Sequence, residues 1–357
     1  MSHPTEDTTS IPAVTIGLDL GDRLTHLYAI DAAGRRLDER PLPTTAAGFT
    51  AYFQDRPRGR VVLEVGTHSP WIARLLTALQ QEVFVANPSA MYGQGRRRRR
   101  NDRSDAEFLA RQGRADVSLL HGIRHRGADA QTPLEELRAR DHAERVRTQL
   151  INHVRGSVKS VGERLSGCAA EAFVRRVTAE IPPTLQAALA PLLATISGLN
   201  ATITQYDGQI EHAIETDYPV AKRLQAPQGV GPLTALAFVL LIDDPTRFAT
   251  SRAVGAYFGL VPRLDESGDV TPQLRITKAG DPLGRRLLVN AAHYVLGPFG
   301  PPSDLRHYGE ALMLRGGKNA KKRAVVAVAR KLAVLLHHLW IHDTPYVPDH
   351  VAARRAA

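Results

Sequence analysis

Short apolar runs separated by polar turns dominate the N-terminal part of the chain. Runs at residues 14–20, 24–30 and 35–41, the last two joined by a turn at 31–34, predict three successive strands. Further strands are predicted at 60–65 and 82–86, and helical spacing predicts helices at 45–54, 70–80 and 104–113. Ser104 and Glu107 have the spacing of a capping box in that last helix. Three strands followed by alternating helices and strands predict an α/β domain with a mixed sheet over residues 1–125.

Longer helical spacing replaces this pattern in the middle of the chain. Apolar residues recur at steps of four and three from Leu185 to Ala213, and residues 151–165 show the same spacing in an earlier helix. Pro182 and Pro183 separate the two helices, and proline suits the first turn of the second. The pattern predicts an antiparallel helical hairpin or coiled-coil arm over residues 126–217, whose narrow seam favours dimerisation. Two core helices of a bundle are the alternative.

The last third of the chain is predicted to be mainly α-helical over residues 218–345, with a tail at 346–357. Helices are expected at 233–242, 283–296, 304–314 and 320–340. Gly229 and Gly231 lie in a proline-flanked run before the first of these helices. Glycines in such a loop leave backbone N–H groups pointing at a helix start, which is a natural phosphate site. The run resembles the hairpin of helix-hairpin-helix DNA-binding modules.

Composition adds a charge preference and excludes some classes. The 357 residues carry a net charge of +10, from 46 Lys plus Arg against 36 Asp plus Glu, which favours a polyanionic partner. Only 7 of the 46 are lysine, so a GC-rich genome is an alternative source of the 39 arginines. The single Cys168 excludes an intramolecular disulfide. A start unlike a signal peptide, and a longest apolar run of only 234–242, predict a cytoplasmic protein with no membrane partner.

Four acidic residues suggest a metal site. Asp19 and Glu64 lie in two predicted strands that neighbour each other in the RNase H-like order of elements, and Asp102 and Asp105 are three apart near a predicted helix start. Carboxylate oxygens from several elements suit Mg²⁺ or Mn²⁺ in phosphoryl transfer. Residues 17–21 also resemble the first phosphate loop of sugar kinases and actin-like ATPases, but the chain has no second copy of that domain.

Basic residues and one serine complete the candidate chemistry. Five successive arginines precede the acidic pair and are interpreted as a nucleic-acid clamp, with a solvated loop as the alternative: Arg96, Arg97, Arg98, Arg99 and Arg100. Ser267 lies in a polar loop beside Gly268, where a serine is suited to attack a phosphodiester but is more often only a turn residue. Cations that could hold a phosphate there are Arg263, Arg275, Lys278, Arg285 and Arg286.

These motifs together resemble one family over nearly the full length. The N-terminal marks are Ile-Gly-x-Asp at Asp19, Leu-Glu at Glu64 and Asn-Asp-x-x-Asp at residues 101–105. The C-terminal marks are Gly-Val-Gly at 229–231, Gly-Leu-Val-Pro-Arg at 259–263, Ser-Gly at 267–268, Thr-Lys-Ala-Gly at 277–280 and Arg-Lys-Leu at 330–332. The chain is similar to the DEDD transposases of bacterial insertion sequences, also called bridge-RNA-guided serine recombinases. It departs from their usual pattern at residues 65–68, after Glu64.

The resemblance implies a fold and a mechanism. It implies a RuvC-like domain in which Asp19, Glu64, Asp102 and Asp105 hold magnesium, and a separate domain that supplies Ser267 as nucleophile. It also implies homodimers or homotetramers with composite sites, donor and target DNA as substrates, and a structured non-coding guide RNA. The expected function is excision and insertion of an insertion sequence through a phosphoserine intermediate. The alternative is a RuvC-like metal-dependent nuclease that uses water.

Overall fold

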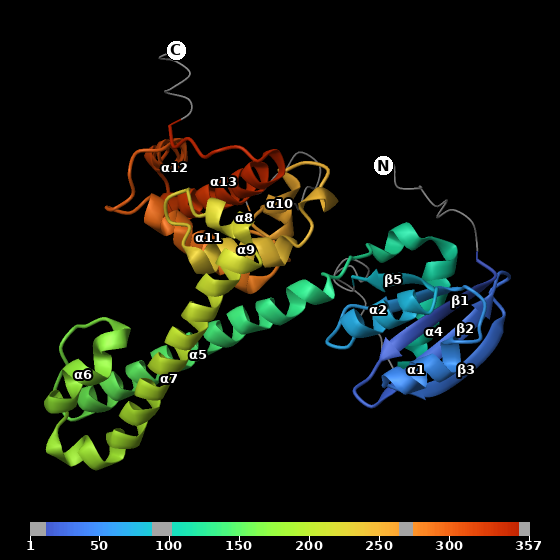
Figure 1. Cartoon of the computed structure of the whole chain (residues 1–357), viewed down its shortest axis with the longest axis horizontal. Coiled ribbons are helices and arrows are strands. Elements are labelled where there is room, and N and C mark those ends of the chain that lie inside the picture. Colours follow the sequence, from blue (N-terminus) through green and yellow to red (C-terminus); the bar gives the residue numbers. More distant parts are fainter. Residues whose placement is uncertain (1–11, 88–101, 264–273, 350–357) are drawn as a thin grey trace. The chain divides into compact units, whose positions relative to one another are not determined.

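The computed structural model describes residues 12–87, 102–263 and 274–349 (Figure 1). The predicted arginine run at 96–100 and Ser267 lie outside the described residues. The chain forms two compact units, residues 1–125 and residues 126–357.

The N-terminal unit is built on one mixed sheet of five strands. The strands are β1 (Val14–Leu20), β2 (Leu24–Asp31), β3 (Arg36–Pro43), β4 (Arg60–Glu64) and β5 (Glu82–Ala86), in the spatial order β3-β2-β1-β4-β5. The meander β1–β3 is antiparallel, whereas β4 pairs with β1 and β5 pairs with β4 in parallel. This order, which places β1 beside β4, is the one expected of an RNase H-like domain.

The two faces of the sheet carry different helices. Helices α1 (Ala46–Phe53) and α2 (Ser69–Ala78) pack on one face through a cluster that includes Leu18, Leu63 and Phe49. Helix α4 (Asp102–Ala115) packs on the other face, where Ala106 and Ala110 contact the strands. Burial of both faces explains why β1 and β4 are almost continuously apolar rather than alternating.

The second unit begins with two long antiparallel helices, α5 (Ala128–Ser160) and α7 (Pro183–Thr216) (Figure 1). Near the end of α5, Val154 and Val158 share a cluster with Leu189 at the start of α7. Near the start of α5, Leu137 shares a cluster with Ile210 at the end of α7. The predicted antiparallel pair is therefore present. A short helix that was not predicted, α6 (Phe173–Val177), packs against the end of the pair where α5 finishes and α7 begins. Coiled-coil supercoiling and dimerisation stay predictions.

The rest of this unit is a helical domain around one apolar helix. Helix α9 (Pro232–Ile242) is buried along most of its length, and α5, α11 and α13 contribute to the same cluster. The surrounding helices are α8 (Pro219–Arg223), α10 (Ala253–Tyr257), α11 (Pro282–Val295), α12 (Asp304–Leu314) and α13 (Ala320–His342). Side-chain caps start two of them, because Asp281 accepts from Leu283 N–H and Ser303 accepts from Arg306 N–H.

Most predicted elements are present, and one detail, the capping box, is wrong. Helix α4 begins at Asp102, so Ser104 lies inside the helix and is not its N-cap. Glu107 instead accepts hydrogen bonds from Tyr28 and Arg111.

By length and composition alone, α7 and α13 are each apolar enough to cross a membrane. Core helices pass the same test, and half of the apolar window of α13 is buried inside its unit. The prediction that no apolar segment is long enough to span a bilayer was made from residues 234–242 alone and did not consider the longer helices α7 and α13.

Candidate functional site

Asp19 and Glu64 lie at the same end of two neighbouring strands. Leu18 of β1 pairs with Leu63 of β4 in a parallel register, so the two acids follow at equivalent positions. A Cβ at Gly17 would meet the Ala106 carbonyl of α4 at 2.0 Å, so Gly17 faces α4. Side chains two residues apart share a face of a strand, which puts Asp19 on the α4 side as well.

The same argument applies to Glu64. Val62 faces α4, since its Cγ2 would lie 2.3 Å from a Cβ at Gly113. Glu64, two residues later, therefore shares that face of the sheet. Asp19 and Glu64 are both half-buried, as is Asp105 on the helix that covers them.

The direction of α4 brings its acidic end to these strand ends. Ala106 packs on Gly17, and Gly113 packs on Val62 and Thr15, so α4 runs antiparallel to β1. Its N-terminus therefore lies toward the carboxyl ends of β1 and β4. Asp105 is in the first turn of α4, and Asp102 is its first residue, although the side chain of Asp102 is not described. The structure thus places the backbones of all four predicted acids at one edge of the sheet.

Arg60 fixes the opposite end of α4 to the sheet. Its buried guanidinium pairs with Glu82, with Nε 2.9 Å from Oε2, and donates to the Gly113 carbonyl at 3.0 Å. Sequence reasoning did not single out Arg60, because a lone arginine in an apolar strand gives no sign of its partner. Gly17 did carry a signal, since glycine inside a strand marks a close backbone approach.

The unusual segment after Glu64 is an ordered turn that begins α2. Gly66 N–H and the Gly66 carbonyl both bond to the Ser69 hydroxyl, at 2.9 and 2.8 Å. His68 accepts from Trp71 Nε1 through Nδ1 at 3.1 Å, and its Nε2 lies 3.6 Å from Asp22 after β1. The departure from the family pattern therefore places His68, which follows β4, near Asp22 in the loop after β1, beside the acidic edge.

The described residues on either side of the segment with Ser267 form a short stem, joined by backbone hydrogen bonds and an isolated bridge between Pro262 and Ile276. Arg263 N–H donates to the Arg275 carbonyl at 2.9 Å, and Thr277 N–H donates to the Val261 carbonyl at 2.9 Å. Gly280 packs so closely on α10 that a Cβ would meet the Tyr257 carbonyl at 1.9 Å. The stem that carries residues 264–273 is therefore firmly attached to the core.

The predicted cations around this stem have different roles. Arg263, Arg275 and Lys278 are exposed on the stem. Arg285 donates to the carbonyls of Phe258 and Gly280, at 3.2 and 3.0 Å, and Arg286 pairs with Asp141 of α5. The last two side chains hold parts of the unit together.

Gly229 and Gly231 lie in the turn between α8 and α9. Gly229 has a φ of +85°, and a Cβ there would meet the Ala291 carbonyl at 2.7 Å. The turn therefore packs on α11, and both its conformation and the space available require a glycine. Gly231 is the N-cap residue of α9, so its backbone opens that helix.

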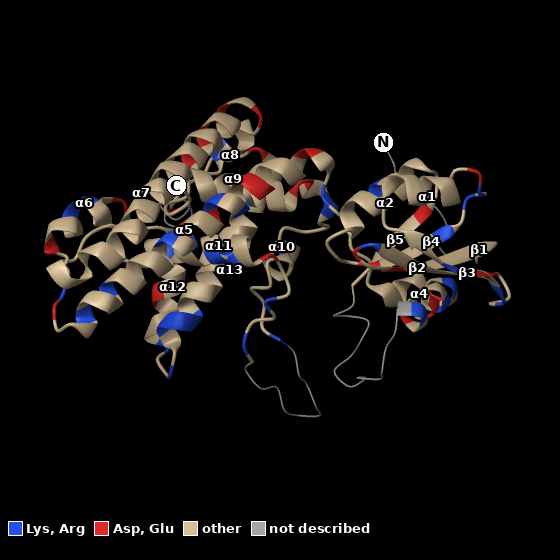
Figure 2. Cartoon of the chain, turned by 90° about the horizontal axis from the view of Figure 1, so that it is seen from below, with Lys and Arg blue, Asp and Glu red and all other residues tan. Residues whose placement is uncertain are grey.

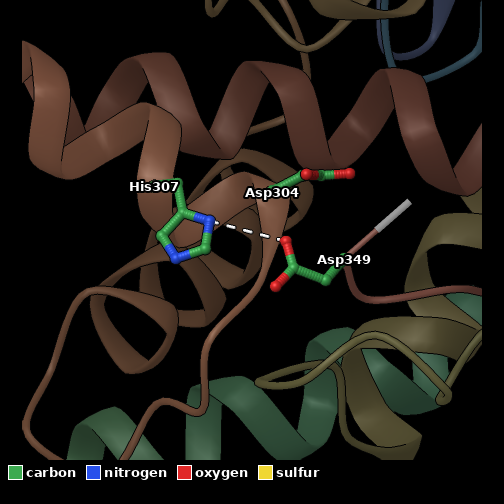
Figure 3. A group of neighbouring side chains, drawn as sticks. All are labelled: Asp304, His307 and Asp349. Atoms are coloured by element: carbon green, nitrogen blue, oxygen red, sulfur yellow. Dashed lines mark ion pairs between the residues drawn. The ribbon is translucent and has the colours of Figure 1, made fainter. Parts of the chain in front are cut away.

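A separate group of metal-binding side chains lies on the helical domain (Figure 3). Asp304, His307 and Asp349 each place one ligand atom within 4.8 Å of the others, and His307 Nδ1 lies 3.5 Å from Asp349 Oδ1. A histidine and two carboxylates are suitable ligands for a divalent ion. This group is on the second unit, and none of its members was predicted.

A mixed sheet in this order, with carboxylates at the shared end of its central parallel strands and on the covering helix, matches the RNase H-like class of α/β domains. Residues 16–162 match the DEDD transposase domain of IS110 elements, and residues 221–308 match the transposase IS116/IS110/IS902 family. The chain belongs to the IS110/IS116 family of DEDD transposases. It is therefore a DNA transposase.

Curated relatives agree with this assignment. A "Probable family 20 transposase" of Pseudomonas aeruginosa is 29% identical over 93% of this chain and 98% of its own length. The transposase for insertion sequence element IS1111A of Coxiella burnetii is 30% identical over 69% of this chain and 68% of its own. A pilin gene-inverting protein of Moraxella bovis is 24% identical, covering 80% of this chain and 81% of its own.

Proposed function

We propose that this transposase excises and inserts an insertion sequence through a phosphoserine intermediate formed by Ser267, with Asp19, Glu64, Asp102 and Asp105 holding Mg²⁺ or Mn²⁺. The observation that supports it best is the convergence of β1, β4 and the start of α4 at one edge of the sheet. Three separated sequence motifs lead to that edge, and each carries a carboxylate, the kind of oxygen donor that such an ion prefers.

Each group has a distinct chemical task in this proposal. A bound ion would polarise the phosphate and stabilise charge on the attacking and leaving oxygens. Ser267 Oγ forms a bond to phosphorus and gives up its proton, while the bond from phosphorus to one sugar oxygen breaks and that oxygen takes a proton. The exposed Arg263, Arg275 and Lys278 flank the segment with Ser267 and could hold the phosphate.

The partners in this proposal are donor and target DNA, a structured non-coding guide RNA, and further copies of the same chain. The name of the Moraxella bovis relative, a pilin gene-inverting protein, supports a reaction that rejoins DNA as well as cutting it. The α5–α7 pair supplies a long surface on which a dimer could form. Action on DNA would take place in the bacterial cytoplasm.

The test mixes the protein with labelled DNA from the end of the element, the guide RNA encoded by the element, and Mg²⁺, and asks whether a covalent protein–DNA species forms. Wild-type protein should yield a species that survives denaturation, and Ser267→Ala should yield none while still binding DNA. Ser160→Ala, at an exposed serine of α5, is the matched control and should behave as wild type. Cleavage that persists in Ser267→Ala without a covalent species would instead establish a water-using nuclease.

A further inference from the structure

The turn between α12 and α13 is a dense cationic surface that the proposed chemistry does not use. We call it the α13 turn, residues 315–323. Five cations project from it, and all five are exposed: Arg315, Lys318, Lys321, Lys322 and Arg323. Figure 2 shows Lys and Arg gathered where α12 gives way to α13.

The sequence makes this surface unusual. The chain has 46 Lys plus Arg, of which only 7 are lysine, and three of those seven lie at positions 318, 321 and 322. A codon preference for arginine accounts for arginines elsewhere but not for these lysines. No Asp or Glu occurs from Ala311 to His342, although acids make up 36 of 357 residues, about one in ten. The local charge is therefore not balanced along the chain.

Folding gives no reason for the lysines. The positive end of the helix dipole at the start of α13 disfavours cations, and this first turn contains no acid. Among the described residues, no ion pair involves Lys318, Lys321 or Lys322. Like charges gathered at an unfavourable position lower stability, unless an anion binds them.

The α13 turn is rigidly presented. Gly316, Gly317 and Asn319 adopt φ values of +69°, +86° and +68°, which fold the chain sharply before the helix. Arg323 Nη2 donates to the Gly316 carbonyl at 3.1 Å. Just beyond, Ala324 and Val325 are buried in the core. The lysines therefore lie on a sharp turn that leads directly into a buried helix.

A concave surface lies beside the lysines. A cavity of about 530 Å³ is lined by Lys321, Lys322 and Asn319 of the turn and by His293 of α11. Each lysine ammonium group carries three hydrogen-bond donors and no acceptor, so the surface suits an anion with several oxygens in a row.

We propose that the α13 turn binds the phosphodiester backbone of duplex DNA without reading its sequence. This rests on the DNA transposase activity but not on the serine chemistry. A duplex carries one charge per about 1.7 Å of its axis, a density that a compact group of lysines can match. An anionic membrane is less suited, because the apolar face of α13, including Val328 and Leu332, is buried in the core.

The test is the salt dependence of binding to a duplex of unrelated sequence, by fluorescence anisotropy with the full chain and EDTA present. Replacing Lys318, Lys321 and Lys322 by Ala should reduce the slope of log K against log salt by up to about 2.7, at about 0.9 per phosphate contact. Affinity near 0.1 M salt should fall on the order of 10- to 100-fold. Replacing the same three by Arg should preserve binding.

The matched control replaces Lys159, Arg175 and Arg176 by Ala. These residues are exposed at the end of the α5–α7 pair that carries α6, so the net charge changes equally and we expect the protein to fold. This control should keep the wild-type slope. A wild-type slope in the lysine variant, or equal losses in both triple variants, would overturn the proposal.

Two further outcomes would reassign the partner and overturn the proposal as stated. If the triple lysine variant lost binding to single-stranded RNA but kept its binding to duplex DNA, the α13 turn would be an RNA site. If the variant lost binding only to vesicles of anionic lipid, the α13 turn would be a membrane site. Because the assay contains no metal and scores no covalent species, it can fail while Ser267-dependent strand transfer succeeds, and the reverse also holds.

Discussion

Gly17→Ala is the sharpest test of how the acidic edge is built. The new Cβ would lie 2.0 Å from the Ala106 carbonyl oxygen and 2.5 Å from the Ala110 nitrogen, both in the backbone of α4. Ordinary contact begins near 3.4 Å, so the helix would have to retreat by 3.4 − 2.0, or about 1.4 Å. No side-chain rotation can relieve a clash with backbone, so the displacement moves the whole of α4, including Asp105.

The expected magnitudes follow from that displacement. Overpacking costs about 1–3 kcal/mol, and a backbone clash should reach the upper end, lowering the Tm of the N-terminal unit by about 10 °C. A shift of about 1 Å in a catalytic group can cost on the order of 100-fold in rate. Metal-dependent strand transfer should fall by about that factor, measured well below the Tm of both proteins, while binding to unrelated DNA persists.

Gly66→Ala is the control on the same edge, because no atom lies within 4 Å of a Cβ there and its φ is not positive. It should change the free energy of unfolding by less than about 1 kcal/mol and retain activity. If Gly17→Ala matched Gly66→Ala in both measurements, close packing of α4 on β1 would not position the acids. A lowered Tm with unchanged activity would separate α4 from the chemistry and refute the site argument.

Three further predictions concern stability. Arg60→Met should lower the free energy of unfolding, measured by chemical denaturation, by about 2–4 kcal/mol, because Glu82 and the Gly113 carbonyl lose their donor. Arg60→Lys should lie between Arg60→Met and the wild type. If Arg60→Met were as stable as the wild type, Arg60 would not hold α4 to the sheet. Burial lowers the pKa of His337, whose Nε2 donates to the Pro245 carbonyl at 2.9 Å. The neutral ring therefore stabilises the fold above the ordinary histidine pKa of about 6.5, and this contribution is lost as the pH falls from there toward the lower pKa of the folded state. His337→Gln should flatten the fall of Tm with pH in this range, and an unchanged slope would assign that fall to other groups. Gly198→Ala, in the exposed interior of α7 with no atom within 4 Å of a Cβ, should stabilise the protein by up to about 1 kcal/mol, and a lower Tm would mean that α7 needs flexibility there.

The sequence by itself determined the local elements and the order in which they follow one another. Strand β1 was predicted with the bounds it has, as were β5 and α12, because apolar periodicity and turn residues act over short distances. The family was also accessible, since Asp19, Glu64 and the acidic pair at 102 and 105 occur in a recognisable order with Ser267. Helix starts were less certain, and α4 begins two residues earlier than its expected start at Ser104.

Only the tertiary structure decided what these residues meet. Gly17 looked like part of a phosphate loop in the sequence, and its packing against Ala106 became visible only when α4 crossed β1. Arg60 pairs with Glu82 on the neighbouring strand and donates to the Gly113 carbonyl on α4, and Arg286 pairs with Asp141 on α5. Such partners are far apart in the chain, and pairing depends on how strands and helices stack, which local periodicity does not encode. The same is true of the lysines of the α13 turn, because only folding places them on one exposed surface, where no described acid forms an ion pair with them.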